Sequence, residues 1–394
     1  MQVLPQPWDS EAVWNQLAPR ISDEIRRPLE SLLAHADGQA LARGECLRLA
    51  TASGDELIAM AAAADLLRKH LVGDTITYVV NRNINFTNVC FVGCKFCAFF
   101  RGPNHPEANF YSPEQVAQKA VEARRLGATE VCIQGGLPHG LPKFYYRDIL
   151  RAIKQAVPDM HIHAFSPMEV TYGVQLTGMS IRDYLAMLRD NGLDTLPGTA
   201  AEILHDDVRH LISKYKLNAV AWEEIIRTAH LLGIRTTSTL MYGHVESPEH
   251  WVDQLLLFRR IQAVTGGFTE FVPLGFVHSN TRLFLEGNSR PGPTPEEHIR
   301  IHALGRIMLA GSINNLQVSW VKLTREMTEQ CLQCGANDFG GTLMEENISR
   351  LAGSTAGQYV SPDEFDERIR AMRRIPAERN TTYTKITPRL EEVA

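Results

Sequence analysis

The spacing of apolar positions along the chain changes near residue 75. Between residues 41 and 71 apolar side chains recur at helical intervals, with Gly54 as a break. From about Thr75 onward, short apolar or β-branched runs alternate with amphipathic stretches. The pattern predicts a helical N-terminal extension over residues 1–75, a strand–helix domain over 76–382 and a C-terminal tail over 383–394.

Eight of the short runs are predicted to be strands. They lie near 77–86, 130–134, 160–165, 193–196, 235–241, 269–274, 316–320 and 336–339. Helices that begin with a Ser or Thr cap and a proline are predicted at 112, 247, 294 and 361. The alternation implies a parallel sheet, and eight units favour an α/β fold of the (β/α)₈ TIM-barrel type. An open doubly wound sheet is the alternative, but the chain has neither a GxGxxG nor a GxxxxGK(S/T) loop.

Composition and charge exclude several classes of protein. The chain has 394 residues, of which 44% are hydrophobic and 22% charged, as in soluble globular proteins. A net charge of −5 argues against a nucleic-acid partner. The N-terminus carries acids and prolines, unlike a signal peptide, and the most apolar stretch (57–67) is too short for a membrane span. We therefore expect a cytoplasmic protein with no membrane partner.

Three of the seven cysteines form a CxxxCxxC motif after the first predicted strand: Cys90, Cys94 and Cys97. Thiolates suit iron–sulfur clusters or zinc. A closed zinc site or an electron-transfer cluster needs four ligands, so three thiolates leave one iron of a [4Fe–4S] cluster open. The motif resembles that of radical S-adenosylmethionine (SAM) enzymes, in which this iron binds SAM and an aromatic residue, here Phe96, precedes the last cysteine. A zinc site that adds His105 is the alternative.

Further candidates lie at strand ends, where barrel enzymes place their chemistry. Glycines after the second strand would let a ligand approach the backbone. A carboxylate after the third strand can anchor SAM or substrate, and a buried carboxylate in the sixth requires a partner. We predict catalytic roles for Glu169, His244 and Glu270, and cofactor binding by Phe96, Gln134, Gly135, Gly136 and Ser166.

Two other pairs are interpreted as structural. His298 and His302 lie four residues apart on a predicted outer helix, where a solvated face is expected. Cys331 and Cys334 have redox spacing but no second pair nearby, so we interpret them as core or surface thiols.

Longer stretches extend the resemblance over most of the chain, from about residue 41 to 382. Residues 81–100 closely resemble the radical SAM group that contains the deazaflavin synthases and the menaquinone-pathway futalosine enzymes. Four runs are most similar to the tyrosine 4-hydroxyphenyl transferase subunits of FO synthase: GTAAEI (198–203), FTEFVPL (268–274), SWVKL (319–323) and GGTLMEE (340–346). On this resemblance, Glu202 of GTAAEI is assigned to cofactor binding.

The resemblance implies a specific reaction. SAM is split into methionine and a 5′-deoxyadenosyl radical, which takes a hydrogen atom from L-tyrosine. The Cα–Cβ bond of tyrosine then breaks, the 4-hydroxybenzyl fragment joins 5-amino-6-(D-ribitylamino)uracil, and 2-iminoacetate is released. The implied partners are a separate radical SAM subunit of FO synthase (CofG-type), since the chain has one CxxxCxxC, and an electron donor such as flavodoxin or ferredoxin.

Two alternatives stay open on the sequence. The dehypoxanthine futalosine cyclase of menaquinone biosynthesis is also similar, although it tends to carry GGGAEI where this chain has GTAAEI. A non-catalytic, zinc-binding barrel belongs to a different class and would lack the iron–sulfur cluster.

Overall fold

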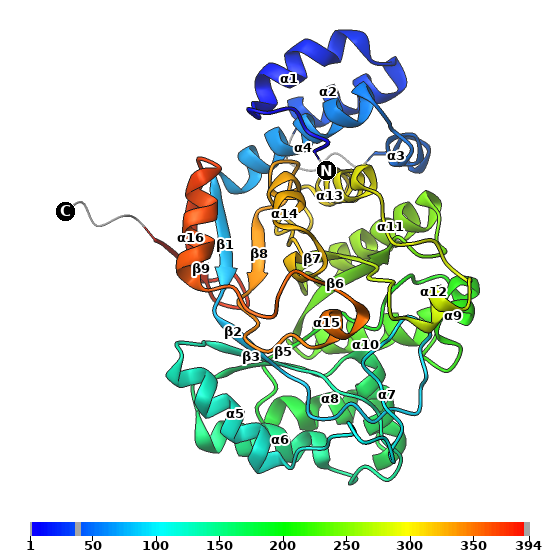
Figure 1. The fold of residues 1–394 in the computed structure, drawn as a ribbon, viewed down its shortest axis with the longest axis vertical. Coiled ribbons are helices and arrows are strands. Elements are labelled where there is room, and N and C mark those ends of the chain that lie inside the picture. Colours follow the sequence, from blue (N-terminus) through cyan, green and yellow to red (C-terminus); the bar gives the residue numbers. More distant parts are fainter. Residues whose placement is uncertain (1, 36–40, 390–394) are drawn as a thin grey trace, which may run out of the picture.

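The computed structural model describes residues 2–35 and 41–389. Residues 2–35 and 41–72 form helices that gather at one end of the molecule, against α13 (Figure 1). Their bounds are α1 (Ser10–Leu17), the 3-10 helix η1 (Ala18–Arg20), α2 (Asp23–Ala34), α3 (Arg43–Ala50) and α4 (Asp55–Val72). The interior of α4 is rich in alanine, the best helix former, and its small side chains allow α1 and α13 to approach closely.

Parallel strands build the centre of the molecule. They are β1 (Thr75–Val79), β2 (Asn81–Ile84), β3 (Glu130–Ile133), β4 (His161–Ala164), β5 (Thr195–Leu196), β6 (Arg235–Tyr242), β7 (Phe268–Gly275) and β8 (Asp338–Gly341). One sheet has the order β2-β3-β4-β5-β6-β7, and β1 pairs with β8 in a second sheet. Parallel bridges through Leu316 and Gln317 connect β7 to β8. The α/β barrel predicted from the sequence is therefore confirmed.

Helices follow the strands and cover the outside of the barrel (Figure 1). They are α5 (Pro113–Arg125), α6 (Tyr145–Ala156), α7 (Pro167–Thr177), α8 (Ile181–Asp190), α9 (Asp206–Ser213), α10 (Ala219–Leu231), α11 (Pro248–Thr265), α12 (Arg282–Leu285), α13 (Pro295–Leu309), η2 (Trp320–Lys322), α14 (Arg325–Leu332), α15 (Ile348–Ala352) and α16 (Pro362–Ala371). The four predicted helix starts are confirmed at α5, α11, α13 and α16. The cap is explicit at α5, where Ser112 Oγ accepts from the Gln115 amide and Gln115 Oε1 accepts from the Ser112 amide.

Two strand predictions were wrong in detail. The run 77–86 divides at Val80 into β1 and β2, which pair with different neighbours. The run 316–320 forms only isolated bridges before it turns into η2, so the seventh position of the barrel is an irregular extended segment. The side chain of Asn337 explains this segment, because its Oδ1 accepts from the Leu316 amide in place of a regular ladder bond.

The C-terminal part of the chain adds two strands that the sequence pattern did not predict. They are β9 (Ile375–Arg379), parallel to β1, and β10 (Ile386–Pro388), antiparallel to β9. β10 lies within the stretch 383–394 that was predicted to be a tail, and residues 390–394 fall outside the described residues. The described part of that stretch therefore packs on the barrel.

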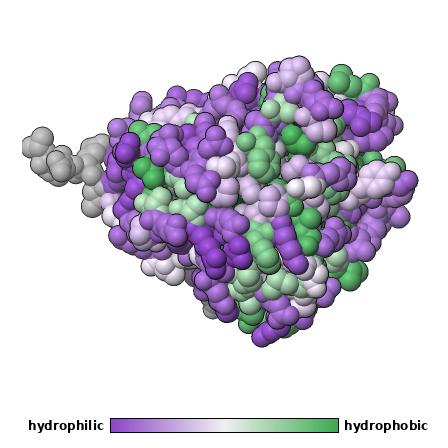
Figure 2. Space-filling model, turned by 90° about the horizontal axis from the view of Figure 1, so that it is seen from below, coloured by the Kyte–Doolittle hydropathy of each residue, from purple (hydrophilic) through white to green (hydrophobic). Residues whose placement is uncertain are grey.

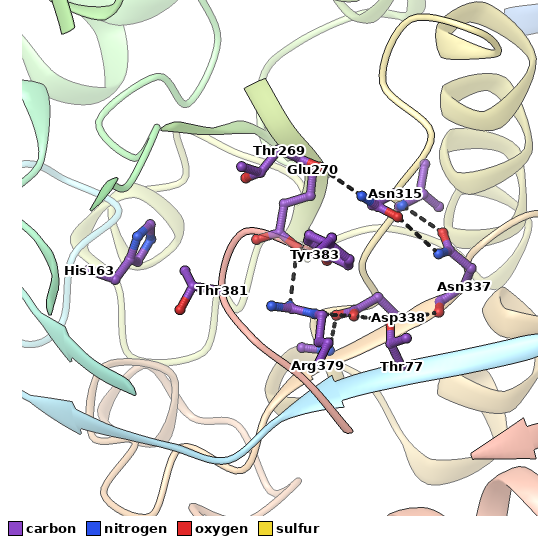
Figure 3. A network of polar contacts seen from close by, with 12 residues as sticks. Thr77, His163, Thr269, Glu270, Asn315, Asn337, Asp338, Arg379, Thr381 and Tyr383 are labelled. Atoms are coloured by element: carbon purple, nitrogen blue, oxygen red, sulfur yellow. Dashed lines mark hydrogen bonds and ion pairs between the residues drawn. The ribbon is translucent and has the colours of Figure 1, made fainter. Parts of the chain in front are cut away.

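A buried polar network occupies the end of the barrel where the strands begin (Figure 3). Arg379 donates two hydrogen bonds to Asp338, at 2.5 and 3.0 Å, and a third to Glu270 at 3.3 Å. The Tyr383 hydroxyl also donates to Glu270, and the Thr381 hydroxyl donates to Glu130 at 2.6 Å. The residues after β9 thus close the amino-terminal end of the barrel, opposite the end at which barrel enzymes place their sites.

Several large apolar side chains are exposed to solvent. Figure 2 shows hydrophilic and hydrophobic residues intermixed on one face. Leu126, just after α5, is 68% exposed, and Val220 (72%) and Leu231 (70%) lie near the two ends of α10. Among the helices of residues 2–35 and 41–389, none combines the length and the apolar character that crossing a bilayer requires.

Candidate active site

A cavity of about 260 Å³ opens at the end of the barrel where the strands finish. Its walls come from the segments that follow β2, β3, β4 and β5, from the end of β6, from the end of β7 and the residues after it, and from η2 and α15. Ten of the predicted site residues line it: Cys90, Cys94, Phe96, Cys97, Gln134, Gly135, Gly136, Ser166, Glu169 and Glu202. The fold therefore brings these residues together from four separate parts of the sequence.

The three cysteines belong to one loop that other segments hold in place. The Lys95 amide donates to the Ile212 carbonyl at the end of α9, and Arg101 donates to the carbonyls of Ala98 and Phe100. Burial raises the pKa of the Cys94 thiol to about 12 and also raises that of Cys97. Because a bound metal deprotonates a coordinating thiol outright, these thiols would ionise when they bind one.

The geometry of the cysteines does not match a single-ion site. Within residues 2–35 and 41–389, no group of three or more His, Cys, Asp or Glu side chains is arranged to hold one metal ion. All three cysteines line the cavity. The number of cysteine ligands to a cluster stays a prediction.

Packing requires glycine at positions 135 and 136. The reason expected from the sequence was different, namely close approach of a ligand to the backbone. A Cβ on Gly135 would lie 2.5 Å from the Phe86 ring, and one on Gly136 would lie 2.2 Å from the Val89 carbonyl oxygen and 3.1 Å from Cys90 Cβ. Protein atoms, rather than ligand atoms, therefore fill the space that a side chain would need. These glycines let the end of β3 lie directly against the segment that carries Cys90.

Replacing Gly136 with alanine is expected to lower both iron content and SAM cleavage by about tenfold or more, since the added methyl must displace the backbone next to Cys90. Iron per chain and 5′-deoxyadenosine formation would be measured on anaerobically reconstituted protein. Gly102→Ala is the matched control, because a Cβ there meets no atom within 4 Å. Wild-type iron content in Gly136→Ala would contradict the packing argument.

Glu169 is the carboxylate on the next wall. Ser166 caps α7, and Glu169 accepts hydrogen bonds from the Ser166 amide (2.6 Å), the Ser166 hydroxyl (2.7 Å) and the Gly135 amide (3.1 Å). Burial raises its pKa to about 7, although these hydrogen bonds oppose that shift. The carboxylate thus has a fixed orientation and a charge that depends on pH near neutrality.

Glu202 forms a buried ion pair with Lys216. Burial opposes its ionisation, but the charges of Lys216 and Arg209 outweigh it and lower the pKa of Glu202. The backbone of this run has positive φ at Ala200 (63°) and Glu202 (42°), and Arg209 holds it by donating to the Ala200 carbonyl at 3.0 Å. The Lys216 ammonium also lies 5.2 Å from the centre of the Phe96 ring, which couples this pair to the cysteine loop.

His244 and Glu270, two of the three residues predicted to be catalytic, do not line the cavity. His244 is buried, with Nε2 3.0 Å from the Met241 carbonyl and Nδ1 3.3 Å from Glu246, which also pairs with Arg290. Glu270 points into the network at the opposite end of the barrel (Figure 3). Glu270 is the third residue of β7 and therefore lies near the start of the strand, whereas the cavity lies at the ends of the strands.

Besides Lys216, sequence reasoning missed three polar residues of the cavity: Asn85, Thr199 and Lys322. Among the described residues, Asn85 Oδ1 and Thr199 Oγ1 are buried without a hydrogen-bond partner, which favours contact with a ligand. Each of the three lies at or just after a predicted strand or within a quoted run. The sequence therefore placed these residues near strand ends or in family-like runs, but it did not show that their side chains face the cavity.

The comparisons with known proteins agree with this architecture. A family model described as "Radical SAM superfamily" matches residues 84–257, and one described as "CofH/MqnC C-terminal region" matches residues 265–390. Methylornithine synthase (PylB) has a TM-score of 0.68 at 16% identity, covering 89% of this chain and 97% of that one. The [FeFe]-hydrogenase maturase HydG has a TM-score of 0.71 at 14% identity, covering 95% and 80%. These structures show the fold.

Relatives with much higher identity show the family. FO synthase of Mycobacterium leprae (strain TN) is 52% identical over 364 residues, which are 92% of this chain and 42% of that protein, so the chain spans less than half of its length. The 5-amino-6-(D-ribitylamino)uracil–L-tyrosine 4-hydroxyphenyl transferase of Methanocaldococcus jannaschii is 49% identical over 323 residues, or 81% of this chain and 90% of that protein. The chain therefore belongs to the radical SAM superfamily and, within it, to the family of FO synthase and this transferase.

Proposed function

We propose that the protein is a radical SAM transferase that breaks the Cα–Cβ bond of L-tyrosine and joins the 4-hydroxybenzyl group to 5-amino-6-(D-ribitylamino)uracil, with release of 2-iminoacetate. The observation that carries this proposal is the 49% identity to the transferase of that name across 90% of its length. The same relatives favour this function over a futalosine cyclase and over a zinc-binding barrel.

The residues of the cavity fit the cofactors that the family implies. Soft thiols of Cys90, Cys94 and Cys97 would hold a [4Fe–4S] cluster. Glu169 would bind the ammonium group of SAM, and the unpartnered atoms of Asn85 and Thr199 would bind polar groups of SAM or of the substrates. When bound, the cluster and SAM supply the one-electron chemistry that breaks a C–H bond of the substrate.

The chain's own residues orient the ligands and exclude water. The cavity has an apolar wall from Met241, Leu274, Phe276 and Val277, which would pack against an aromatic ring and keep solvent from a reactive carbon. Outside the cavity lining, Arg290 pairs with Glu246 at 2.8 Å and ties the loop before α13 to the loop after β6. His244 contacts the same carboxylate, so we infer a positioning role for it.

Two further partners belong to the proposal. A second radical SAM subunit of the CofG type would take up the adduct and close the deazaflavin ring, since FO synthases are more than twice as long as the stretch matched here. An electron donor such as flavodoxin or ferredoxin would reduce the cluster.

An anaerobic product assay tests the proposed function. Reconstituted, reduced protein would be incubated with SAM, L-tyrosine and the ribityl-uracil, and 5′-deoxyadenosine, 2-iminoacetate and the adduct would be quantified. We expect all three products together, and none of the last two when tyrosine is omitted. SAM cleavage without 2-iminoacetate would refute the transferase, and turnover of dehypoxanthine futalosine would favour the cyclase.

Replacing Glu169 with glutamine is expected to weaken SAM binding about 10- to 100-fold, because a charged partner of the SAM ammonium is lost. Wild-type affinity should also weaken as the pH falls from about 8 to about 6: burial raises the pKa of Glu169 to about 7, and protonation below it removes the negative charge. Glu169→Gln should show no such pH dependence. Equilibrium dialysis with unreduced holoprotein would measure both effects.

Glu122→Gln is the matched control for this experiment, since Glu122 is 46% exposed and pairs with Arg82 outside the cavity. It should bind SAM as the wild type does. If Glu169→Gln retained wild-type SAM affinity, Glu169 would have no part in SAM binding.

A further inference from the structure

Two lysines line the cavity, and they differ in their partners. Lys216 forms an ion pair with Glu202. Lys322, in η2, donates from Nζ to the Ser349 hydroxyl at 3.0 Å, and in the part of the chain that the structure describes it forms no ion pair. An ammonium group has three N–H donors, so two remain beside the one that Ser349 accepts.

The surroundings of Lys322 compensate its charge only in part. Burial lowers the pKa of Lys322, and the charges of Glu346, Glu202 and Cys97 oppose that shift without overcoming it. Glu346 is itself occupied, because it accepts from the amides of Ile348 and Ser349 at 3.1 and 3.0 Å. A partly buried cation with free donors in a ligand cavity is stabilised by an anionic group of the ligand.

The cavity that Lys322 lines also has apolar walls. Ile348 and Ala352 of α15, which contacts η2, line the cavity, and Phe276 and Val277 after β7 add further apolar surface to it. A ligand that combines a carboxylate with an aromatic or aliphatic body would satisfy both features. A phosphate is a poorer match, because only one cation with two free donors is available.

We propose that Lys322 binds the α-carboxylate of an amino-acid ligand and that Ser349 is the positioning residue that orients its ammonium group. This inference rests on the proposed function, under which the cavity receives two α-carboxylates, those of L-tyrosine and of SAM. Lys216 is already paired with Glu202 and contacts Phe96 of the cysteine loop, whereas Lys322 has free donors on the wall built by the C-terminal third of the chain. Lys322 is therefore assigned to tyrosine.

Binding measurements with tyrosine and tyramine test the assignment. Tyramine keeps the phenol and the amine of tyrosine but lacks the carboxylate. Equilibrium dialysis would use anaerobic holoprotein with SAM and without reductant, so that binding is measured apart from turnover. Wild-type protein is expected to prefer tyrosine over tyramine by about 10- to 100-fold. Lys322→Met should raise the Kd of tyrosine by that factor, leave the Kd of tyramine unchanged and thereby remove the preference.

Three further variants sharpen the test. Lys322→Arg keeps a cation and should restore part of the preference, and Ser349→Ala should cause a smaller loss than Lys322→Met. Lys143→Met is the matched control, because Lys143 is exposed and lies outside the cavity. Its tyrosine and tyramine affinities should equal those of the wild type.

The outcomes separate the two carboxylates. Loss of tyrosine affinity in Lys322→Met with unchanged SAM affinity supports the assignment. Loss of SAM affinity alone places the carboxylate of SAM on Lys322 and overturns the assignment to tyrosine. A preference for tyrosine that survives in Lys322→Met overturns the carboxylate site altogether. Failure of the proposed function would look different: wild-type holoprotein would then neither bind tyrosine nor release 2-iminoacetate.

Discussion

Replacing Cys94 with alanine is expected to abolish SAM cleavage while the protein stays folded. The Cys94 thiol lines the cavity beside Cys97 and contributes one of three soft ligands to the proposed cluster. Without it the cluster loses a third of its protein ligands, and iron should fall from about four per chain to a small fraction of that. Iron analysis, absorbance near 400 nm and 5′-deoxyadenosine formation on anaerobically purified protein would measure the loss.

The control for this variant is Cys46→Ala. Cys46 is buried in α3, outside the barrel and away from the cavity, so its removal takes away a thiol without touching the proposed ligands. It should retain iron and SAM cleavage. Circular dichroism should show the same helix content for both variants. A Cys94→Ala protein that still holds about four irons and cleaves SAM would contradict the ligand assignment, and a colourless wild type containing zinc would refute the cluster.

Replacing Arg379 with methionine is expected to cost about 3–5 kcal/mol of stability. Arg379 is 4% exposed and compensates two buried carboxylates, Asp338 at 2.5 Å and Glu270 at 3.3 Å. Its removal leaves both without a cation and also removes the group that lies 4.1 Å from the centre of the Tyr383 ring. The thermal midpoint should fall by roughly 5–10 °C.

The pH dependence of this loss identifies its electrostatic origin. Burial raises the pKa of Glu270 to about 7 even with Arg379 in place. In Arg379→Met the carboxylate should protonate more readily still, so the stability deficit should shrink as the pH falls from about 8 to about 5. Arg43→Met is the control: Arg43 and Asp253 are each 50% exposed, so loss of this surface ion pair should lower the stability far less than loss of Arg379, at every pH in this range. A deficit in Arg379→Met that does not change with pH would indicate lost packing instead.

Local pattern predicted most of the fold because local chemistry determines it. Ser112 and Thr294 start helices through hydrogen bonds to residues three positions later, which the sequence displays directly. The prediction of a regular seventh strand was wrong because the side chain of Asn337, 21 residues away, accepts from the Leu316 amide and interrupts the backbone hydrogen-bond ladder there. β9 and β10 were missed because they are stabilised by pairing with β1 and with each other, not by a periodic pattern of their own.

Packing of other helices over α13 also buried side chains that the sequence pattern placed in solvent. α13 was expected to present His298 and His302 to solvent, yet His302 is fully buried and His298 Nδ1 lies 2.6 Å from the Tyr242 hydroxyl. The N-terminal helix α4 covers this side of the barrel, so α13 has no free face there. Cys331 and Cys334 are likewise buried, in agreement with their interpretation as core thiols.

The sequence by itself determined the α/β barrel, the cysteine loop and the family, because strand–helix alternation and the CxxxCxxC spacing are local properties of the chain. Only the tertiary structure decided which charged residues face the cavity. Glu169 and Glu202 do, Glu270 belongs to the closed end of the barrel, and Lys322 lines the cavity with no ion-pair partner among residues 2–35 and 41–389. The physical reason is that the direction and the partners of a side chain depend on other segments of the chain, such as Arg379 for Glu270, which are 109 residues apart, and no local pattern records them.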